Sequence, residues 1–147
     1  MQDIIERDIT LKAPIDRVWA AITDYREFGT WFRVVLDGPF ALGLVTTGKI
    51  AEPGYEGLGF WAVTVEMAPW RFGFDWPADP AMTPDQRGPG KTTRVTFDLT
   101  EVADGTRVVI RESGFAALPG DLGPQKLRDN DRGWVIQAER IKAHVGG

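Results

Sequence analysis

The sequence predicts an α+β fold in which a curved, seven-stranded antiparallel sheet wraps around one long C-terminal helix. A strand-like N-terminal segment is followed by two short helical segments, and strand-like runs then succeed one another between turn residues. The C-terminal segment repeats its apolar residues at helical spacing. A length of 147 residues suits one hydrophobic core, so we expect a single domain over residues 1–147.

The N-terminal segment alternates between two faces from Ile4 to Lys12, which is typical of a half-buried strand. Pro14 then suits the first position of a short helix that should end near Asp24. Asp24 can cap a second short helix, with Glu27 as its capping-box partner. Two helices in tandem should therefore follow the first strand.

Six further strand-like runs lie near residues 33–40, 44–51, 58–68, 70–76, 91–102 and 105–114. The Asp104-Gly105 pair predicts a tight hairpin, because such a pair supplies the positive φ angles that the turn needs. Residues 77–90 contain four prolines and no apolar rhythm, so they predict a long exposed loop, either a lid or slack. The final helix should open at Pro124 and run nearly to the C-terminus.

Composition excludes several kinds of site. The chain has no cysteine, which removes disulfides, thiolate nucleophiles, zinc–thiolate sites and iron–sulfur clusters. His144 is the only histidine and the carboxylates do not cluster, so we expect no metal and no cofactor. A formal charge of −4 disfavours nucleic-acid binding. The sequence has no signal-peptide pattern and no apolar stretch that could span a bilayer, so we expect a cytoplasmic protein without membrane insertion.

Four segments carry a family resemblance: APIDRVWAAITDYREFGTWF at 13–32, RFGFDW at 71–76, TRVTFDLTEVADGTRVVIRESGF at 93–115 and GWVIQAERI at 133–141. They resemble, in the same order, the activator of heat-shock protein 90 ATPase homologue family within the START-like, birch-pollen-allergen-like (SRPBCC) superfamily. The resemblance implies a helix-grip fold with an elongated cavity between the concave sheet and the last helix. Superfamily members use this cavity for lipids, polyketides, hormones and other apolar molecules.

Alternation over residues 70–76 places Trp70, Phe72, Phe74 and Trp76 on one face of a strand. Aromatic stripes usually fill a core, but they also line apolar binding cavities, and both interpretations stay open here. Trp134 opens the apolar stripe of the last helix and should pack on the concave face of the sheet.

Arg7 and Glu112 lie on otherwise apolar strand faces, where an unpartnered polar group costs about 1–3 kcal/mol. We hypothesise that both point into the cavity and either pair with each other or present a charge to a ligand. The alternative is that both reach water at frayed strand ends. Asn130 could bond a ligand or satisfy a strand end. The complete set of predicted ligand-binding residues is Arg7, Trp31, Trp61, Phe72, Phe74, Trp76, Phe97, Glu112, Asn130 and Trp134.

The leading functional hypothesis is a small-molecule binding protein that holds an apolar or aromatic ligand, lipid-like or polyketide-like, in this cavity. The first alternative is an enzyme of the aromatase/cyclase type in which Glu112 moves protons and proximity supplies most of the catalysis. The second is a chaperone-associated or stress-response protein, and a chaperone partner would need an exposed apolar patch. Exposed edge strands also lead us to expect that homodimers can form.

Overall fold

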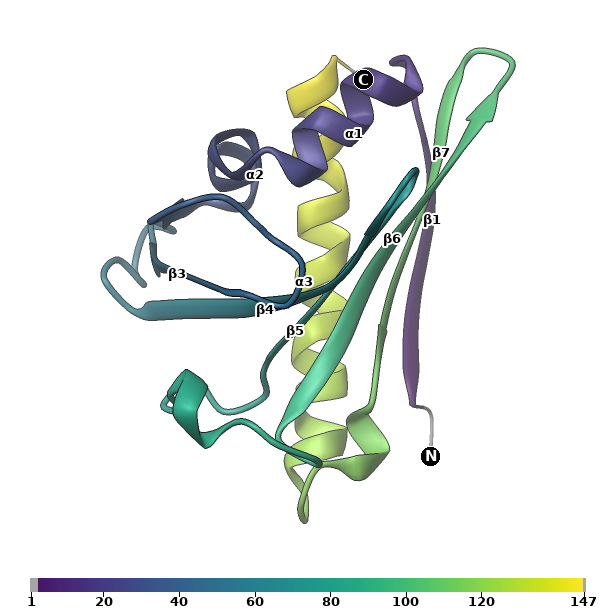
Figure 1. The fold of residues 1–147 in the computed structure, drawn as a ribbon. Coiled ribbons are helices and arrows are strands. Elements are labelled where there is room, and N and C mark those ends of the chain that lie inside the picture. The colour runs from purple at the N-terminus through teal and green to yellow at the C-terminus, as the bar shows by residue number, and fades with distance from the viewer. Residues whose placement is uncertain (1–2, 147) are drawn as a thin grey trace.

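The computed structural model describes residues 3–146 and has one seven-stranded sheet around a long C-terminal helix (Figure 1). The elements in chain order are β1 (Ile4–Leu11), α1 (Ile15–Thr23), α2 (Tyr25–Phe32), β2 (Val34–Leu36), β3 (Val45–Ile50), β4 (Gly59–Ala68), β5 (Arg71–Pro77), η1 (Pro84–Gln86), β6 (Thr92–Val102), β7 (Gly105–Ser113), η2 (Phe115–Ala117) and α3 (Leu122–Val145). The predicted α+β helix-grip architecture is confirmed, including its two short helices after the first strand.

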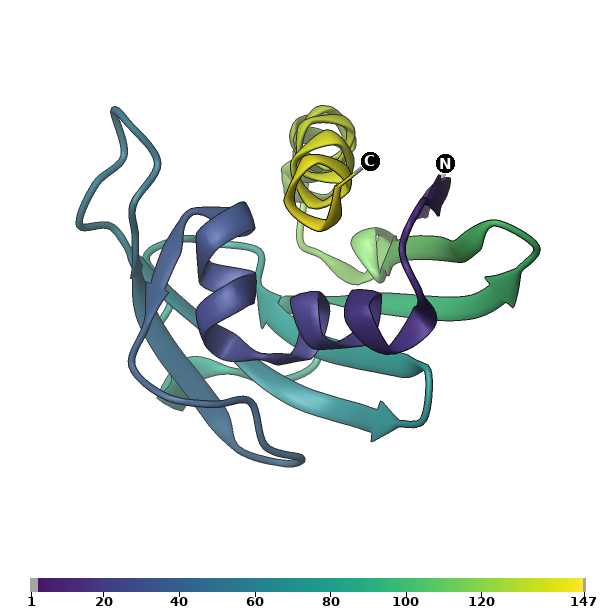
Figure 2. The same cartoon turned by 90° about the horizontal axis from the view of Figure 1, so that it is seen from above.

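The strands follow the order β1-β7-β6-β5-β4-β3-β2, and every neighbouring pair is antiparallel. β1 and β2 are therefore the edge strands. Figure 2 shows α3 lying in the hollow of the curved sheet, while α1 and α2 cross one end of it. The sheet twists, so that its β3 and β4 end turns away from α3. The helix therefore lies closer to the β1 and β7 half of the sheet than to the β3 and β4 half.

The second helix is capped as predicted, but its capping box is not formed. The Asp24 carboxylate accepts the backbone N–H groups of Arg26 and Glu27. The Glu27 side chain does not return to this cap; its Oε1 instead contacts Arg17 at 2.5 Å and His144 Nε2 at 2.9 Å. This carboxylate therefore ties α2 to α1 and to the last turn of α3.

The β6–β7 hairpin forms where predicted, with Val102 opposite Gly105, but its positive φ angle of 158° falls on Gly105 alone. A Cβ atom at Gly105 would lie 2.0 Å from the carbonyl oxygen of Leu11. Glycine is needed at this position for two reasons: the end of β1 passes close to the Gly105 backbone, and the turn requires a positive φ angle.

Two sequence-based boundaries are corrected. Trp70 lies outside the predicted strand, in the β4–β5 turn with φ of 71°, and packs its ring edge-on against Trp19. The last helix begins at Leu122, two residues before Pro124. Proline is tolerated there because the first four N–H groups of a helix have no partner within it.

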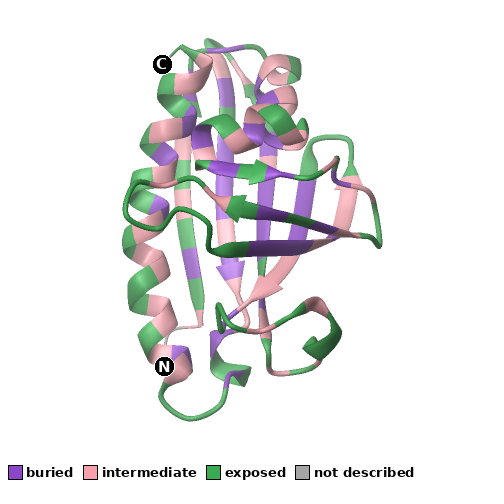
Figure 3. Ribbon diagram, turned by 90° about the vertical axis from the view of Figure 1, so that its left-hand side faces the viewer, coloured by how far each residue is buried: buried purple, intermediate pink, exposed green. Residues whose placement is uncertain are grey.

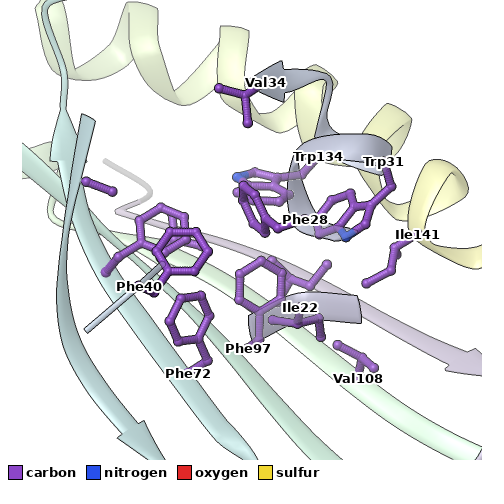
Figure 4. Close-up of a cluster of buried hydrophobic side chains, with 14 of the residues drawn as sticks. Ile22, Phe28, Trp31, Val34, Phe40, Phe72, Phe97, Val108, Trp134 and Ile141 are labelled. Carbon is purple, nitrogen blue, oxygen red and sulfur yellow. The ribbon is translucent and has the colours of Figure 1, made fainter. Parts of the chain in front are cut away.

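The core fills the space between the sheet, the two short helices and the C-terminal half of α3. Buried residues recur on the strands and on the side of α3 that faces the sheet (Figure 3). Aromatic rings dominate this core, and Figure 4 shows Phe28, Trp31, Phe72, Phe97 and Trp134 gathered together. Interlocked rings make the region beneath α1 and α2 a packed core.

Candidate functional site

A pocket of about 520 Å³ lies between α3 and strands β3, β4 and β5, beside the end of α2. Five aromatic residues, Phe32, Tyr55, Phe60, Trp61 and Trp76, line it. The volume falls within the range of small-molecule sites, which is about 300–1,000 Å³. The helix and the sheet diverge here, so the core rings leave this space unfilled.

The mouth of the pocket carries large apolar side chains that are exposed to solvent. Tyr55 and Leu58, from the loop between β3 and β4, are 61% and 54% exposed, and Ile136 of α3 is 52% exposed. Exposed apolar residues that gather around one concave site are typical of binding surfaces.

The loop after β5 forms another part of the wall. Pro77, Ala78 and Pro80 line the pocket, and the Trp61 indole N–H donates to the carbonyl oxygen of Met82 at 2.8 Å. This hydrogen bond fastens the loop to β4. The proline-rich segment is thus a structural part of the pocket as well as an exposed connection.

The structure brings some of the predicted site residues together and separates others. Trp61, Trp76 and Asn130 line the pocket. The predicted residues that are buried in the aromatic core and do not line this pocket are Trp31, Phe72, Phe74, Phe97 and Trp134. Arg7 and Glu112 also lie outside the lining.

Glu112 is completely buried and accepts hydrogen bonds from side chains on three elements. Its donors are the indole N–H of Trp76 at 2.9 Å, the Thr93 hydroxyl at 2.5 Å, the Asn130 amide at 3.0 Å and the indole N–H of Trp134 at 2.8 Å. No cation pairs with it among residues 3–146. Neutral donors therefore satisfy this carboxylate, which is what a buried charge requires in place of an ion pair.

Glu112 lies directly behind the pocket wall, because Trp76 and Asn130 each line the pocket and donate to it. The rings of Trp76 and Trp134 also stack, with centroids 5.9 Å apart. The carboxylate fixes the rotamers of wall residues without touching the pocket.

Arg7 does not pair with Glu112. Its guanidinium contacts the Asp131 carboxylate at 2.5 Å, and the two side chains are 29% and 49% exposed. Arg7 does share the inner face of β1, but its long side chain reaches past the apolar layer to solvent at α3. The Arg7 side chain therefore agrees with the alternative that it reaches water at the edge of the sheet, and not with a position inside the cavity.

A charged cluster that sequence reasoning missed lies at the rim of the pocket. Arg140 of α3 grips both oxygens of Glu52 at 3.0 Å, while Arg33, at the end of α2, approaches the same carboxylate at 3.4–3.5 Å. The hydrogen bond from Arg140, helped by the charge of Arg33, holds the pKa of Glu52 below its ordinary value. These residues come from three distant parts of the chain, so no local motif could indicate them.

Two further pocket residues on α3 were also missed. Gly133 lies in the interior of the helix, and a Cβ atom there would meet nothing within 4 Å. Glycine lowers helix stability by about 1 kcal/mol relative to alanine, which is a signal that the sequence did offer. Gln137 lines the same wall, and its buried Oε1 accepts no hydrogen bond within the described part of the chain.

Among residues 3–146, no group of three or more His, Asp or Glu side chains is placed to hold a metal ion. No helix in this range combines the length and the apolar character that crossing a membrane requires.

Known proteins of similar structure share the fold. Protein MLL2253 from Mesorhizobium loti is 18% identical, with a TM-score of 0.75 over 96% of this chain and 95% of that one. The Aha1 dimer from Colwellia psychrerythraea is 17% identical, with a TM-score of 0.72 over 98% and 96%. DynU16, a protein of the dynemicin biosynthetic locus, is 23% identical, with a TM-score of 0.71; the alignment covers 98% of this chain but 47% of DynU16.

At these identities the likeness shows the common fold alone. A comparison with curated proteins found no match. The family model described as activator of Hsp90 ATPase homolog 1-like protein matches residues 12–146. Because this match covers nearly the whole chain, the protein belongs to the activator of Hsp90 ATPase homolog 1-like family.

Proposed function

We propose that this protein binds an apolar or aromatic small molecule, lipid-like or polyketide-like, in the pocket between α3 and strands β3 to β5. The observation that carries the proposal is the aromatic wall of Phe32, Phe60, Trp61 and Trp76 around about 520 Å³ of space. Small-molecule sites are mostly apolar, with a few polar groups that fix orientation. The Asn130 amide and the buried Gln137 Oε1 supply such groups.

Backbone positions around the pocket also favour an occupied space. Gly59 and Gly133 line it from opposite sides, and a Cβ atom added at either position would meet no atom within 4 Å. Glycine at both positions therefore leaves open space beside the backbone of the pocket. A ligand of planar or extended shape would pack against the bare backbone.

The position of Glu112 supports binding in preference to catalysis. A general acid or base must come within hydrogen-bond reach of the reacting group, whereas Trp76 and Asn130 separate Glu112 from the pocket. We therefore assign Glu112 the role of positioning the wall residues. The aromatase/cyclase alternative would require these donors to leave the carboxylate before proton transfer.

Assembly and location are further parts of this proposal. The similar Aha1 of Colwellia psychrerythraea was solved as a dimer, and the edge strand β2 carries Val35 with 65% exposure, so we expect homodimers through a sheet edge. The single domain over residues 1–147 and the cytoplasmic location stay predictions from the sequence. A chaperone partner is supported by the family relationship alone.

The test is a titration with 1-aminoanthracene, a neutral fluorescent aromatic probe. Wild-type protein should bind it saturably with an increase in fluorescence. Gly133→Met should weaken binding about tenfold or more by filling the pocket, whereas Gly133→Ala should change it little, since one methyl group occupies little of the space.

Both variants should keep the wild-type circular dichroism spectrum, because the added Cβ meets no atom within 4 Å and both residues favour a helix more than glycine does. Equal affinity of Gly133→Met and the wild type would contradict the proposed site. An absence of saturable binding in the wild type would contradict the proposed function.

A further inference from the structure

We propose that the pocket selects apolar ligands that carry an anionic group, such as aromatic or long-chain carboxylates, and that Arg33 is the main residue that binds this group. The inference rests on the proposed function and narrows its ligand class. It is independent of which apolar skeleton fills the aromatic part of the pocket.

The charge at the pocket is opposite to that of the chain. The whole protein has a formal charge of −4, yet the charged residues that line the pocket are three cations, Arg33, Lys126 and Arg140, and one anion, Glu52. The cations stand beside the aromatic wall, so an anionic group on a ligand that packs against this wall would lie close to them. A neutral apolar ligand would gain no charge–charge attraction from these cations, whereas an anionic ligand would.

The cations are not equally available. Arg140 donates a 3.0 Å hydrogen bond to one oxygen of Glu52 and makes a 3.0 Å ion-pair contact with the other, so both ends of its planar guanidinium already face this carboxylate. Arg33 reaches Glu52 only at 3.4–3.5 Å through one nitrogen, and its side chain is 46% exposed. Within residues 3–146 its guanidinium makes no hydrogen bond beyond those to Glu52, so its remaining donors can bind a second carboxylate. Glu52 would then orient Arg33 beside the incoming group.

The backbone of Arg33 adds an independent observation. Arg33 is the C-cap of α2 in the left-handed conformation, with φ of 65° and ψ of 57°, and its carbonyl oxygen accepts the N–H of Ala51. Glycine usually occupies this position because a side chain there costs about 1–2 kcal/mol. A residue held in an unfavourable conformation beside a pocket suggests that its side chain has a function.

The experiment compares 2-naphthoate with 2-naphthamide, which have the same ring and differ in charge. Each displaces 1-aminoanthracene from the protein. The wild type should prefer the carboxylate by about tenfold or more, as expected for charge-assisted hydrogen bonds. Higher salt concentration should reduce this preference and leave naphthamide binding unchanged.

Arg33→Gly is the decisive variant, because glycine suits the left-handed backbone and keeps the fold while the guanidinium is lost. The preference should fall to about threefold or less, with naphthamide affinity and Tm retained. Glu52→Gln should act in the opposite direction and raise the preference, since it releases both arginines. Arg128→Gln, on the exposed side of α3 outside the pocket lining, changes the net charge equally and should have no effect.

Equal affinities of the two naphthalenes in the wild type would overturn this inference and leave the proposed function standing, provided that 1-aminoanthracene binds and responds to Gly133→Met. A preference that survives Arg33→Gly would overturn the assignment to Arg33. If none of the three aromatic compounds binds, the inference and the proposed function both fail.

Discussion

The indole N–H of Trp134 donates a 2.8 Å hydrogen bond to the carboxylate of Glu112, joining α3 to β7 inside the protein. The same carboxylate accepts the indole of Trp76 from β5 and the amide of Asn130 from α3. One buried acceptor thus fixes the distance between the helix and the sheet at the inner end of the pocket.

Replacing Glu112 should strongly destabilise the protein. Glu112→Leu would leave the Trp134 indole N–H, the Thr93 hydroxyl and the Asn130 amide without their acceptor, and each buried unsatisfied donor costs about 1–3 kcal/mol. The Trp76 indole N–H would keep only Thr93 Oγ1, at 3.0 Å. We expect Glu112→Leu to lower the free energy of unfolding by about 3 kcal/mol or more. The stability of Glu112→Gln should lie between that of Glu112→Leu and that of the wild type. Urea denaturation measures this loss. Glu101→Gln, at an exposed position of β6 with no ion pair in the described part of the chain, is the control and should stay within about 0.5 kcal/mol of the wild type.

Trp76→Phe distinguishes the contribution of the Trp76 ring from that of its indole N–H group. Phenylalanine keeps an aromatic surface at the pocket but cannot donate to Glu112. We expect a stability loss of about 1–2 kcal/mol and weaker binding of 1-aminoanthracene, because the wall ring is no longer held in place. Unchanged stability in denaturant would show that the Trp76 hydrogen bond contributes nothing to the fold.

Acid should destabilise the contact between α2 and α3. Burial opposes ionisation of Glu27, but hydrogen bonds from His144 and Arg17 outweigh burial and hold the pKa of this carboxyl below its ordinary value. A lowered pKa in the folded state means that the unfolded chain binds the proton more readily, so the stability due to Glu27 is present near neutral pH and is lost as the pH falls.

The stability gap between the wild type and Glu27→Gln should therefore narrow between about pH 5 and about pH 3, as measured by urea denaturation at each pH. Glu139→Gln, on the exposed side of α3, serves as the matched control and should show a small gap that does not change. A gap for Glu27→Gln that widens toward acid would contradict this assignment.

Gly105→Ala should destabilise the β6–β7 hairpin and its contact with β1. The added Cβ would lie 2.0 Å from the carbonyl oxygen of Leu11, so the backbone must move. We expect a loss of about 2 kcal/mol or more, together with faster amide exchange in β1. The matched variant is Gly38→Ala, where the Cβ meets nothing within 4 Å, and its stability should change by less than about 1 kcal/mol.

Sequence patterns located the elements well because their signals are local. Alternation from Ile4, the cap at Asp24 and the turn before Gly105 each depend on neighbouring residues, and all three lie where expected. Trp70 shows the limit of such patterns. Alternation predicted that Trp70 belongs to the strand, whereas it lies in the turn between β4 and β5 with a left-handed backbone conformation.

The candidate site was predicted less completely. Trp61, Trp76 and Asn130 line the pocket, and Glu112 was identified as a polar residue on an apolar face. The partners of Glu112 could not be assigned from the sequence. The alternation of residues along the strand is equally compatible with a pairing to Arg7 and with the hydrogen-bond donors that the structure shows. The outcome depended on which side chain of α3 stands opposite β7, and that is set by helix packing.

The sequence by itself determined the order and type of the elements, the aromatic richness of the interior and the family. Only the tertiary structure decided where the unfilled space lies and which charges surround it. Arg33, Glu52 and Arg140 are far apart in the chain and meet because the sheet curves around α3. Side-chain periodicity reports on neighbours within one element, whereas a pocket depends on the angle at which separate elements pack.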